Sequence, residues 1–429
     1  MTGQTDESCT RAQRGMDKRR RSHVKITRWT TALVILMFLL AACGGTPATT
    51  PTGAATDAPT DSPTDAPTDA PTDAPTDAPT DAPTDAPTDA PTDAATDGEA
   101  ITIGFVTHVV GNPFIQQIID GAEAAADDLG VELQVAGPEG GDANAQLIAV
   151  QNLVAAGADG IATSVPGESM VSGLNEIIAE GTPVVQFNLL VTDVNAPYVG
   201  ERSVESGRIL GARVLEELGG ASAEGKVIIG NCFPGFPVLE NRAQGVQESL
   251  AEAPGLEVLG PFDVKVAANE NYAAWEALLQ ANPDVSAMIG LCAPDVTSLG
   301  QLQEANSDTP FISGGYDLTA ENLAEIEEGN AFVSLGQTPF MQGYLPVKML
   351  VDSIRDGVDL SQGGFVDAGT EIVTADSVQE PYDLPPLTFE ELQELAASPE
   401  ATRAYYQPLV DSVIANWQDN VEPIENESQ

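Results

Sequence analysis

Short apolar runs alternate along the chain with longer stretches in which apolar residues recur every three or four positions. The run ITIGFVT is followed by a stretch that places Phe114, Ile118 and Ala122 on one side of a predicted helix. Asp142 precedes the next such stretch and is a candidate helix cap. Strands that alternate with helices of this length predict an α/β fold, in which parallel sheets are covered by helices on both faces.

The alternation occurs in two similar halves, the first over residues 101–188 and the second over residues 204–329. This repetition predicts two doubly wound parallel-sheet lobes. Residues 331–374 supply further strands and one more helix. The last segment, residues 380–429, is predicted to be helical and peripheral.

The N-terminal segment has the pattern of an export signal. Basic residues cluster over residues 11–28, and residues 32–42 form an unbroken apolar run. A membrane-spanning helix needs about 20 residues, so residues 1–43 are interpreted as a signal peptide rather than an uncleaved anchor. The ending Leu-Ala-Ala-Cys43 resembles the bacterial lipobox, which implies cleavage before Cys43 and a lipid on its sulfur, at the outer face of the cell membrane. Met1 and Met16 are both candidate start positions.

Residues 44–99 consist largely of a Pro-Thr-Asp-Ala repeat, with an aspartate at every fourth position from Asp57 to Asp97. Proline at this spacing prevents a helix and favours an extended chain, and the like charges extend it further. With nothing apolar to bury, the segment is predicted to be a disordered spacer. A glycosylated stalk and a calcium-binding acidic tract are the alternatives.

The formal net charge of −48 makes nucleic acid an improbable partner, because such a surface repels phosphates. The chain has 2 histidines, which excludes a histidine-based metal cluster, and a Ser-His-Asp triad would have to use His108. Neither G-x-G-x-x-G before a helix nor G-x-x-x-x-G-K-[ST] occurs, so phosphate-cradling loops are missing. We therefore expect no cofactor and no metal.

Cys232 and Cys292 end the first and third predicted strands of the second half. In the strand order 2-1-3-4-5 these strands are neighbours. Neighbouring strands lie about 4.8 Å apart, within the reach of a disulfide. An exported domain permits that bond. The pattern favours a bridge over two buried free thiols.

In open parallel sheets a ligand lies beyond the carboxyl ends of the strands. The segments that follow the predicted strands include THVVGNPF, FNLL, NCFPGF and GGYD. They carry amides, carboxylates and phenyl rings, and one arginine lies in a following helix. Such groups bind hydroxyls and stack on an apolar ring face, which are the two surfaces of a sugar.

Four stretches resemble one family: GNPFIQQIIDGAEAAADDLG, VLENRAQGV, PFISGGYDLTAENLAEIEEG and LGQTPFMQGYLPVKML. They are similar to the ribose-binding-protein-like type I periplasmic substrate-binding proteins of sugar ABC importers, in this order and across residues 100–376. The resemblance implies two lobes that close on one ligand and then deliver it to a membrane permease. It implies a receptor rather than an enzyme, and we expect a monomer.

The resemblance also implies three chain crossings that form a hinge, near residues 201–204, 337–339 and 366–369. The first lobe would then comprise residues 100–203 and 338–367. The second lobe would comprise residues 204–337 and 368–379.

The resemblance assigns roles to six residues by position. Asn112 would bind a hydroxyl, Phe114 would stack on the sugar ring, and Asn188 would follow the fourth strand. Arg242 would bind hydroxyls or the ring oxygen, Asp317 would accept from two hydroxyls, and Gln337 would face the cleft at a crossing. Four further candidates lie on strand-end loops: His108, Glu168, Phe236 and Asp295.

Each main candidate has a plainer interpretation. Asn112 and Asp317 could cap helices, Phe114 could belong to the core, and Arg242 could form a surface ion pair. The sequence departs from the ribose receptors at Asn188-Leu189, where they have Asp-Arg. It departs again at Ile115 and at Pro294, which replace a second aromatic residue and an asparagine. These differences argue against ribose itself.

Other functions are compatible with the pattern. A receptor of the same build could bind a nucleoside, a polyol or a furanosyl signal molecule, or could feed a signalling protein instead of a permease. A carboxylate-dependent glycosidase would draw on Asp317, Asp295 and Glu168, although no pair at a defined spacing is evident.

Overall fold

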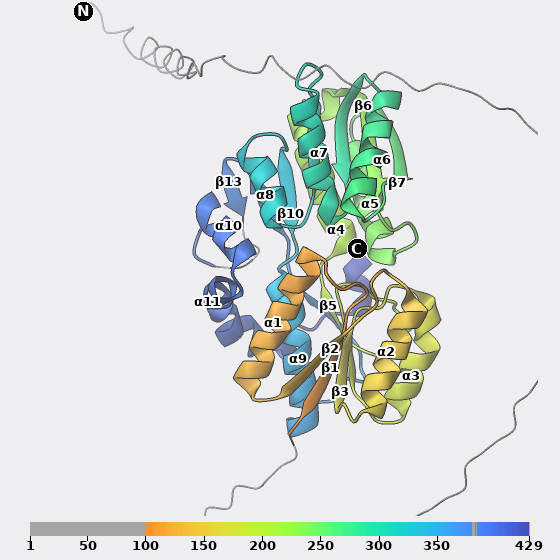
Figure 1. Cartoon of the computed structure of the whole chain (residues 1–429), viewed down its shortest axis with the longest axis vertical. Coiled ribbons are helices and arrows are strands. Elements are labelled where there is room, and N and C mark those ends of the chain that lie inside the picture. The colour runs from red at the N-terminus through yellow and green to blue at the C-terminus, as the bar shows by residue number, and fades with distance from the viewer. Residues whose placement is uncertain (1–99, 380–381, 383, 429) are drawn as a thin grey trace, which may run out of the picture. The chain divides into compact units, whose positions relative to one another are not determined.

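The structure, a computed structural model, describes residues 100–379, 382 and 384–428. These residues form two α/β lobes and a C-terminal tail (Figure 1). The predicted signal peptide, the lipidation site Cys43 and the acidic spacer lie outside the described residues. In the described part of the chain, no helix combines the length and the apolar character that a membrane crossing requires.

The first lobe has a six-stranded sheet in the order β11-β5-β4-β3-β1-β2, and all its pairings are parallel. Its strands are β1 (Thr102–Val106), β2 (Glu132–Ala136), β3 (Gly160–Thr163), β4 (Val184–Phe187), β5 (Tyr198–Gly200) and β11 (Phe365–Asp367). Its helices are α1 (Pro113–Leu129), α2 (Ala143–Ala155), the 3-10 helix η1 (Glu168–Met170), α3 (Val171–Ala179) and α9 (Pro339–Asp356). Asp142 caps α2, as the sequence predicts.

The second lobe has a seven-stranded sheet in the order β13-β12-β10-β9-β8-β6-β7. Only its last two strands, β12 and β13, pair antiparallel. Its strands are β6 (Glu224–Asn231), β7 (Gly255–Asp263), β8 (Val285–Gly290), β9 (Ile312–Tyr316), β10 (Val333–Gly336), β12 (Glu371–Thr374) and β13 (Ser377–Gln379). Its helices are α4 (Ser203–Glu217), η2 (Gly220–Ser222), α5 (Pro237–Leu250), α6 (Ala268–Ala281), α7 (Ala293–Ala305) and α8 (Ala320–Glu327). The predicted fold class, two doubly wound lobes, is confirmed.

The chain passes between the two sheets three times. It leaves β5 for α4 at residues 201–202, leaves β10 for α9 at residues 337–338, and leaves β11 for β12 at residues 368–370. All three crossings follow strand ends, so they meet at the edge where the carboxyl ends of the two sheets face each other.

Helices α4 and α5 pack unusually closely beside the first crossing. A Cβ atom on Gly207 would lie 2.2 Å from the backbone oxygen of Arg242. Only glycine permits this approach, because any side chain would overlap the neighbouring backbone. The close packing fixes α5, and with it the base of the Arg242 side chain, against the start of α4.

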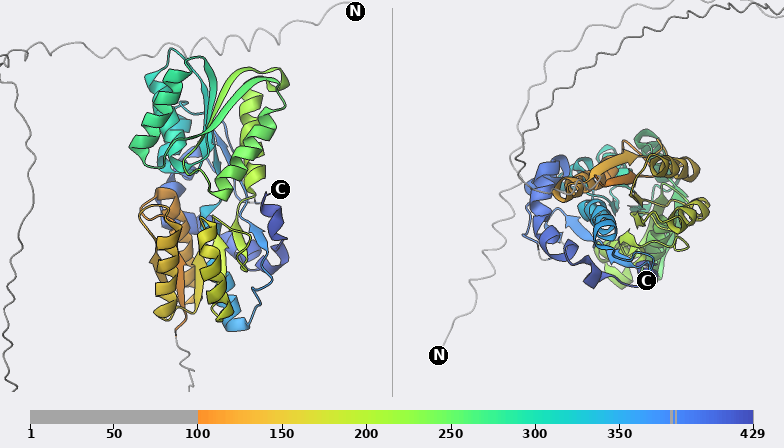
Figure 2. Two further views of the ribbon diagram at one scale, coloured as in Figure 1. Left: turned by 90° about the vertical axis from the view of Figure 1, so that its right-hand side faces the viewer. Right: turned by 90° about the horizontal axis from the view of Figure 1, so that it is seen from below.

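Residues 384–428 are helical, but they are less peripheral than the sequence predicts. The segment comprises α10 (Phe389–Ala397), α11 (Pro399–Leu409), the π-helix η3 (Val410–Ile414), and the 3-10 helices η4 (Trp417–Asn420) and η5 (Ile424–Ser428). Leu392 packs with Leu323 of the second lobe, whereas Tyr406 and Trp417 enter the core of the first lobe. Figure 2 shows the dark blue end of the chain at the boundary between the lobes. The tail therefore packs against both lobes, because its apolar side chains are buried together with apolar residues of each lobe.

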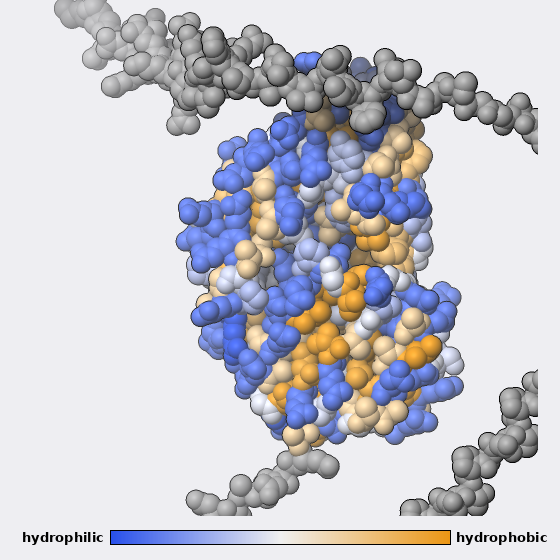
Figure 3. Space-filling model, viewed as in Figure 1, coloured by the Kyte–Doolittle hydropathy of each residue, from blue (hydrophilic) through white to orange (hydrophobic). Residues whose placement is uncertain are grey.

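The visible surface in Figure 3 is mostly hydrophilic, as the net charge of −48 leads one to expect. Apolar residues gather over the first lobe, where Val135 on β2 and Ile148 on α2 are exposed. β2 lies at one edge of the first sheet, and its side chains are less buried than those of β1 and β3.

The disulfide that the sequence favours is present. Cys232 and Cys292 follow β6 and β8, which are neighbours in the sheet, and their Cα atoms lie 6.2 Å apart. The two cysteines are separated by 60 positions. The bridge therefore closes a long loop at the carboxyl edge of the second sheet.

We expect the double substitution Cys232→Ala/Cys292→Ala to lower the free energy of unfolding by about 2–4 kcal/mol, because a bridge over a loop of this length restricts the unfolded chain. Urea unfolding with and without dithiothreitol measures this. Reductant should destabilise the unmodified protein and leave the variant unchanged. Equal effects of reductant on both proteins would contradict the prediction.

Candidate functional site

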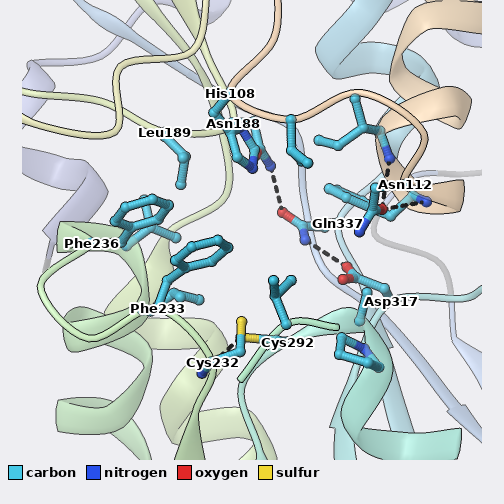
Figure 4. Close-up of a pocket in the computed structure, with 18 of the residues that line it drawn as sticks. His108, Asn112, Asn188, Leu189, Cys232, Phe233, Phe236, Cys292, Asp317 and Gln337 are labelled. Carbon is cyan, nitrogen blue, oxygen red and sulfur yellow. Dashed lines mark hydrogen bonds between the residues drawn. A yellow bond between two sulfur atoms is a disulfide. The ribbon is translucent and has the colours of Figure 1, made fainter. Parts of the chain in front are cut away.

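A cavity of about 70 Å³ lies between the lobes, at the carboxyl ends of the strands of both sheets. Residues of both lobes line it (Figure 4). Eight of the predicted site residues are among them: His108, Asn112, Phe114, Asn188, Phe236, Arg242, Asp317 and Gln337. Residues far apart in the sequence thus converge on one small space.

Glu168 and Asp295 do not line this cavity, so the structure does not bring them together with the other candidates. Glu168 is exposed, because its 3-10 turn directs it to the surface. Asp295 is fully buried and caps α7: Oδ2 accepts from the Cys292 backbone N–H at 2.9 Å, and Oδ1 accepts from the Trp275 indole at 2.8 Å. Burial raises the pKa of Asp295 to about 6. Its hydrogen bonds hold the second lobe together rather than a ligand.

Asn112 has both of the roles considered for it. Its Oδ1 caps α1 by accepting from the backbone N–H of Phe114 at 2.9 Å and of Ile115 at 3.3 Å. The cap fixes the side chain, so that the remaining Nδ2 group is held at the cavity as a donor. Phe114 lines the cavity and also belongs to the buried core of the first lobe, with 6% of its surface exposed.

Asn188, Gln337 and Asp317 form a chain of hydrogen bonds from the first lobe, across the second crossing, to the second lobe (Figure 4). Asn188 Nδ2 donates to Gln337 Oε1 at 3.3 Å, and Gln337 Nε2 donates to Asp317 Oδ1 at 2.6 Å. Asn188 and Asp317 each follow a strand and have positive φ angles of 59° and 74°. Such conformations persist where the surrounding structure enforces them. We call Asn112, Asn188, Gln337 and Asp317 the polar strip.

The second oxygen of Asp317 accepts no hydrogen bond from any described residue. Burial raises the pKa of Asp317 to about 6, although the nearby Arg242 guanidinium opposes this shift. At neutral pH the side chain is therefore a carboxylate, which can accept hydrogen bonds from two hydroxyl groups.

Arg242 is buried, with 3% of its surface exposed, so the interpretation as a surface ion pair is wrong. Its Nε and Nη2 groups bind Oε1 of Glu201, which is 1% exposed, and Nη1 donates to the backbone oxygen of Leu291 at 2.9 Å. The guanidinium carbon lies 3.9 Å from the centroid of the Tyr316 ring. Two of its five N–H groups keep no partner among the described residues, and they are free to bind a ligand.

Glu201 and Tyr316 were not predicted as parts of the site. The position of Glu201 at the first crossing was the available signal, but a single carboxylate in so acidic a chain does not stand out. Tyr316 is the last residue of β9; its ring contacts Arg242, and its hydroxyl lies 3.0 Å from that of Ser206. Tyr316 and Arg242 are far apart in the sequence, so only the folded structure reveals their contact.

An apolar wall faces the polar strip. It consists of Leu189, Phe233, Phe236, Val238 and the Cys232–Cys292 disulfide. The rings of Phe233 and Phe236 stack on each other, with centroids 4.6 Å apart and planes 4° from parallel. Sequence reasoning identified Phe236 but missed Phe233, although the motif NCFPGF contains both.

His108 lies at the end of the polar strip, beside Asn188 in Figure 4. Its Nδ1 atom lies 3.3 Å from the hydroxyl oxygen of Ser164. Burial lowers the pKa of His108 to about 4, so the ring is neutral at pH 7.

Within residues 100–379, 382 and 384–428, no group of three His, Cys, Asp or Glu side chains is arranged to hold a metal ion.

The arrangement can bind a small molecule through hydroxyl groups on one side and apolar contact on the other. A glycosidase would need two carboxyl groups facing the scissile bond. Of the three carboxylates considered for that chemistry, only Asp317 lines the cavity.

Comparison with known proteins identifies the family of this chain and relatives of similar sequence. The model of the periplasmic binding protein domain family matches residues 103–357. A xylose/arabinose-binding protein of Sulfolobus acidocaldarius is 24% identical over 299 residues, which is 65% of this chain and 72% of the relative. A ribose import binding protein of Escherichia coli is 25% identical over 244 residues, which is 56% of this chain and 79% of the relative.

Solved structures have the same fold. A glucose-galactose binding protein from Geobacillus stearothermophilus superposes with a TM-score of 0.59 at 24% identity, and the match covers 65% of this chain and 99% of that one. An ABC transporter solute-binding protein from Burkholderia graminis, in complex with D-arabinose, has a TM-score of 0.61 at 23% identity over 64% and 96% of the two chains.

We expect Glu201→Gln to lower the free energy of unfolding by about 3 kcal/mol or more, because it leaves the Arg242 charge buried without its counter-ion. The matched control is Glu205→Gln in the first turn of α4, which removes an exposed partner of Arg208 and should change stability by less than about 1 kcal/mol. Urea unfolding of the three proteins provides the measurement. Equal stability of the two variants would contradict the prediction.

The raised pKa of Asp317 predicts a pH-dependent stability. Between pH 4 and pH 6 the folded state holds this proton more tightly than the unfolded state, so the free energy of unfolding falls as pH rises. Asp317→Asn removes this contribution. As pH rises through that range, the variant should therefore gain about 3 kcal/mol of stability relative to the unmodified protein. Unfolding curves at several pH values measure the difference. A relative loss of stability in the variant would mean that Arg242 dominates and lowers the pKa instead.

Proposed function

The chain belongs to the periplasmic binding protein family, and we propose that it is the substrate-binding lipoprotein of an ABC importer that captures a monosaccharide between its two lobes. The observation that carries this proposal is the polar strip, which connects the lobes through Gln337 and presents unpaired hydrogen-bonding groups to the cavity. The sugar-binding relatives support the class of ligand.

Binding in this proposal works by a shift of population. The ligand binds the closed arrangement of the lobes better than the open one, because only closure brings Asn112 of the first lobe and Arg242 of the second lobe to the same molecule. The closed lobes then present a composite surface to a permease. No covalent bond is made or broken.

The N-terminal sequence is the basis for the location that we propose for this receptor. In the proposal, Cys43 carries the lipid that holds the protein at the outer face of the membrane. In the same proposal, the acidic repeat that follows serves as a spacer. Together they would let the lobes collect ligand at a distance from the membrane without loss of the protein.

A thermal-shift screen against pentoses, hexoses, polyols and nucleosides tests the proposal. At a concentration one hundred times its dissociation constant, a ligand adds about 2.7 kcal/mol to the free energy of unfolding, and we expect at least one monosaccharide to raise the Tm by several degrees. Asp317→Ala should weaken that ligand at least about tenfold, because hydrogen bonds to a charged group are lost.

The control variant is Glu168→Ala, which removes an exposed carboxylate outside the cavity and should leave affinity unchanged. A response to nucleosides alone would replace the sugar by another ligand class. If no compound in the panel raised the Tm, the proposal would fail.

A further inference from the structure

The two sides of the cavity differ in chemistry (Figure 4). The labelled residues Asn112, Asp317 and Gln337 lie on one side of the picture, and Leu189, Phe233 and Phe236 lie on the other. Groups that line the cavity and lack a partner among the described residues include the second oxygen of Asp317, Nδ2 of Asn112 and two N–H groups of Arg242. Those of Asp317 and Asn112 lie on the polar side, whereas Arg242 follows Val238 by one helical turn and stands where the polar strip meets the apolar wall. The ring of His108, with its centroid 6.2 Å from that of Phe236, lies at another part of this boundary. The groups without a partner can bind hydroxyls along one edge of a ligand.

The apolar wall has little to offer a hydroxyl. The side chains of Leu189, Phe233, Phe236 and Val238 carry no hydrogen-bonding atoms. The backbone N–H of Cys232 donates to Cys292 Sγ at 3.3 Å, and that of Phe233 donates to the side chain of Asn231 at 2.9 Å. A hydroxyl buried against this wall would lose water without gaining a replacement partner.

Aromatic rings also cover the C–H face of an ordinary sugar, but this wall extends further than a ring face. Phe233 and Phe236 stack on each other, so that each uses one of its faces within the pair. The wall then continues to the aliphatic Leu189 and Val238 and to the disulfide. It therefore has more apolar surface than stacking on one ring face requires, and the remainder is available to an edge of a ligand.

We infer that the ligand is a deoxy sugar, in which a methyl or methylene group replaces a hydroxyl-bearing carbon and lies against the apolar wall. This inference rests on the proposed function, since it assumes that the cleft binds a monosaccharide. It narrows the class of ligand from monosaccharides to deoxy sugars. In this arrangement the hydroxyl groups of the sugar bind Asp317, Asn112 and Arg242. The deoxygenated carbon contacts Phe233 and Val238.

Pairs of sugars that differ at one carbon test the inference by isothermal titration calorimetry. L-fucose is compared with L-galactose, L-rhamnose with L-mannose, and 2-deoxy-D-ribose with D-ribose. We expect the deoxy member of at least one pair to bind about tenfold to a hundredfold more tightly, which is the range over which an apolar pocket rejects an added hydroxyl. If the hydroxylated member bound as tightly or more tightly in every pair, the inference would be overturned and the sugar-binding proposal would stand. If no member of any pair bound, the proposed function itself would fail.

A variant of nearly the same shape gives a second test. Val238→Thr places a hydroxyl on the apolar wall and should reduce the preference for the deoxy sugar several-fold, because the hydroxylated partner gains a hydrogen bond. Val258→Thr makes the same change on β7, outside the cavity, and should leave the preference unchanged. The Tm without ligand checks that both variants are folded. An unchanged ratio of dissociation constants in Val238→Thr would count against contact between the ligand and this part of the wall.

Discussion

The buried ion pair between Arg242 and Glu201 is the interaction on which the site depends. Removing two charges from water is unfavourable, and the attraction between the charges together with further hydrogen bonds offsets this penalty. The guanidinium has such further partners, whereas Glu201 Oε2 is buried without a hydrogen-bond partner among the described residues. Here Arg242 comes from the second lobe and Glu201 from the first crossing, while Leu291 and Tyr316 complete the surroundings of the guanidinium. The pair fixes a positive charge beside Asp317, and the backbone contact at Gly207 holds the helix that carries it.

The backbone conformation at the strand ends explains how the residues of the polar strip come together on one side of the cavity. Asn188 and Asp317 adopt left-handed conformations directly after β4 and β9, which turns the chain sharply there. Hydrogen bonds hold both turns: Tyr198 donates to the backbone oxygen of Asn188, and Ser334 donates to that of Asp317. The strain is thus maintained by buried partners, and Gln337 joins the two turned residues into one continuous strip.

Much of this architecture could be predicted because it follows from local rules. Periodicity gives the strands and helices, and the carboxyl-end rule brings Asn112 and Asp317 to one edge. The same rule does not bring Asp295 to the cavity, because a strand-end carboxylate can equally well cap the following helix from inside the protein. Partners across the fold, such as Glu201 for Arg242, leave no local signal. Their identification requires the packing of α5 against α4.

The tail contacts the region around the first chain crossing. Its last turn places Glu427 in a buried position, where it accepts hydrogen bonds from Ser203 and Asn241 at the start of α4 and on α5. Burial raises the pKa of Glu427, and the charge of Glu201 adds to this shift. Because Glu201 also binds Arg242, the tail, the first crossing and the cavity share one electrostatic neighbourhood. A movement of the lobes that altered this neighbourhood would also act on the tail, whose other contacts bind it to both lobes.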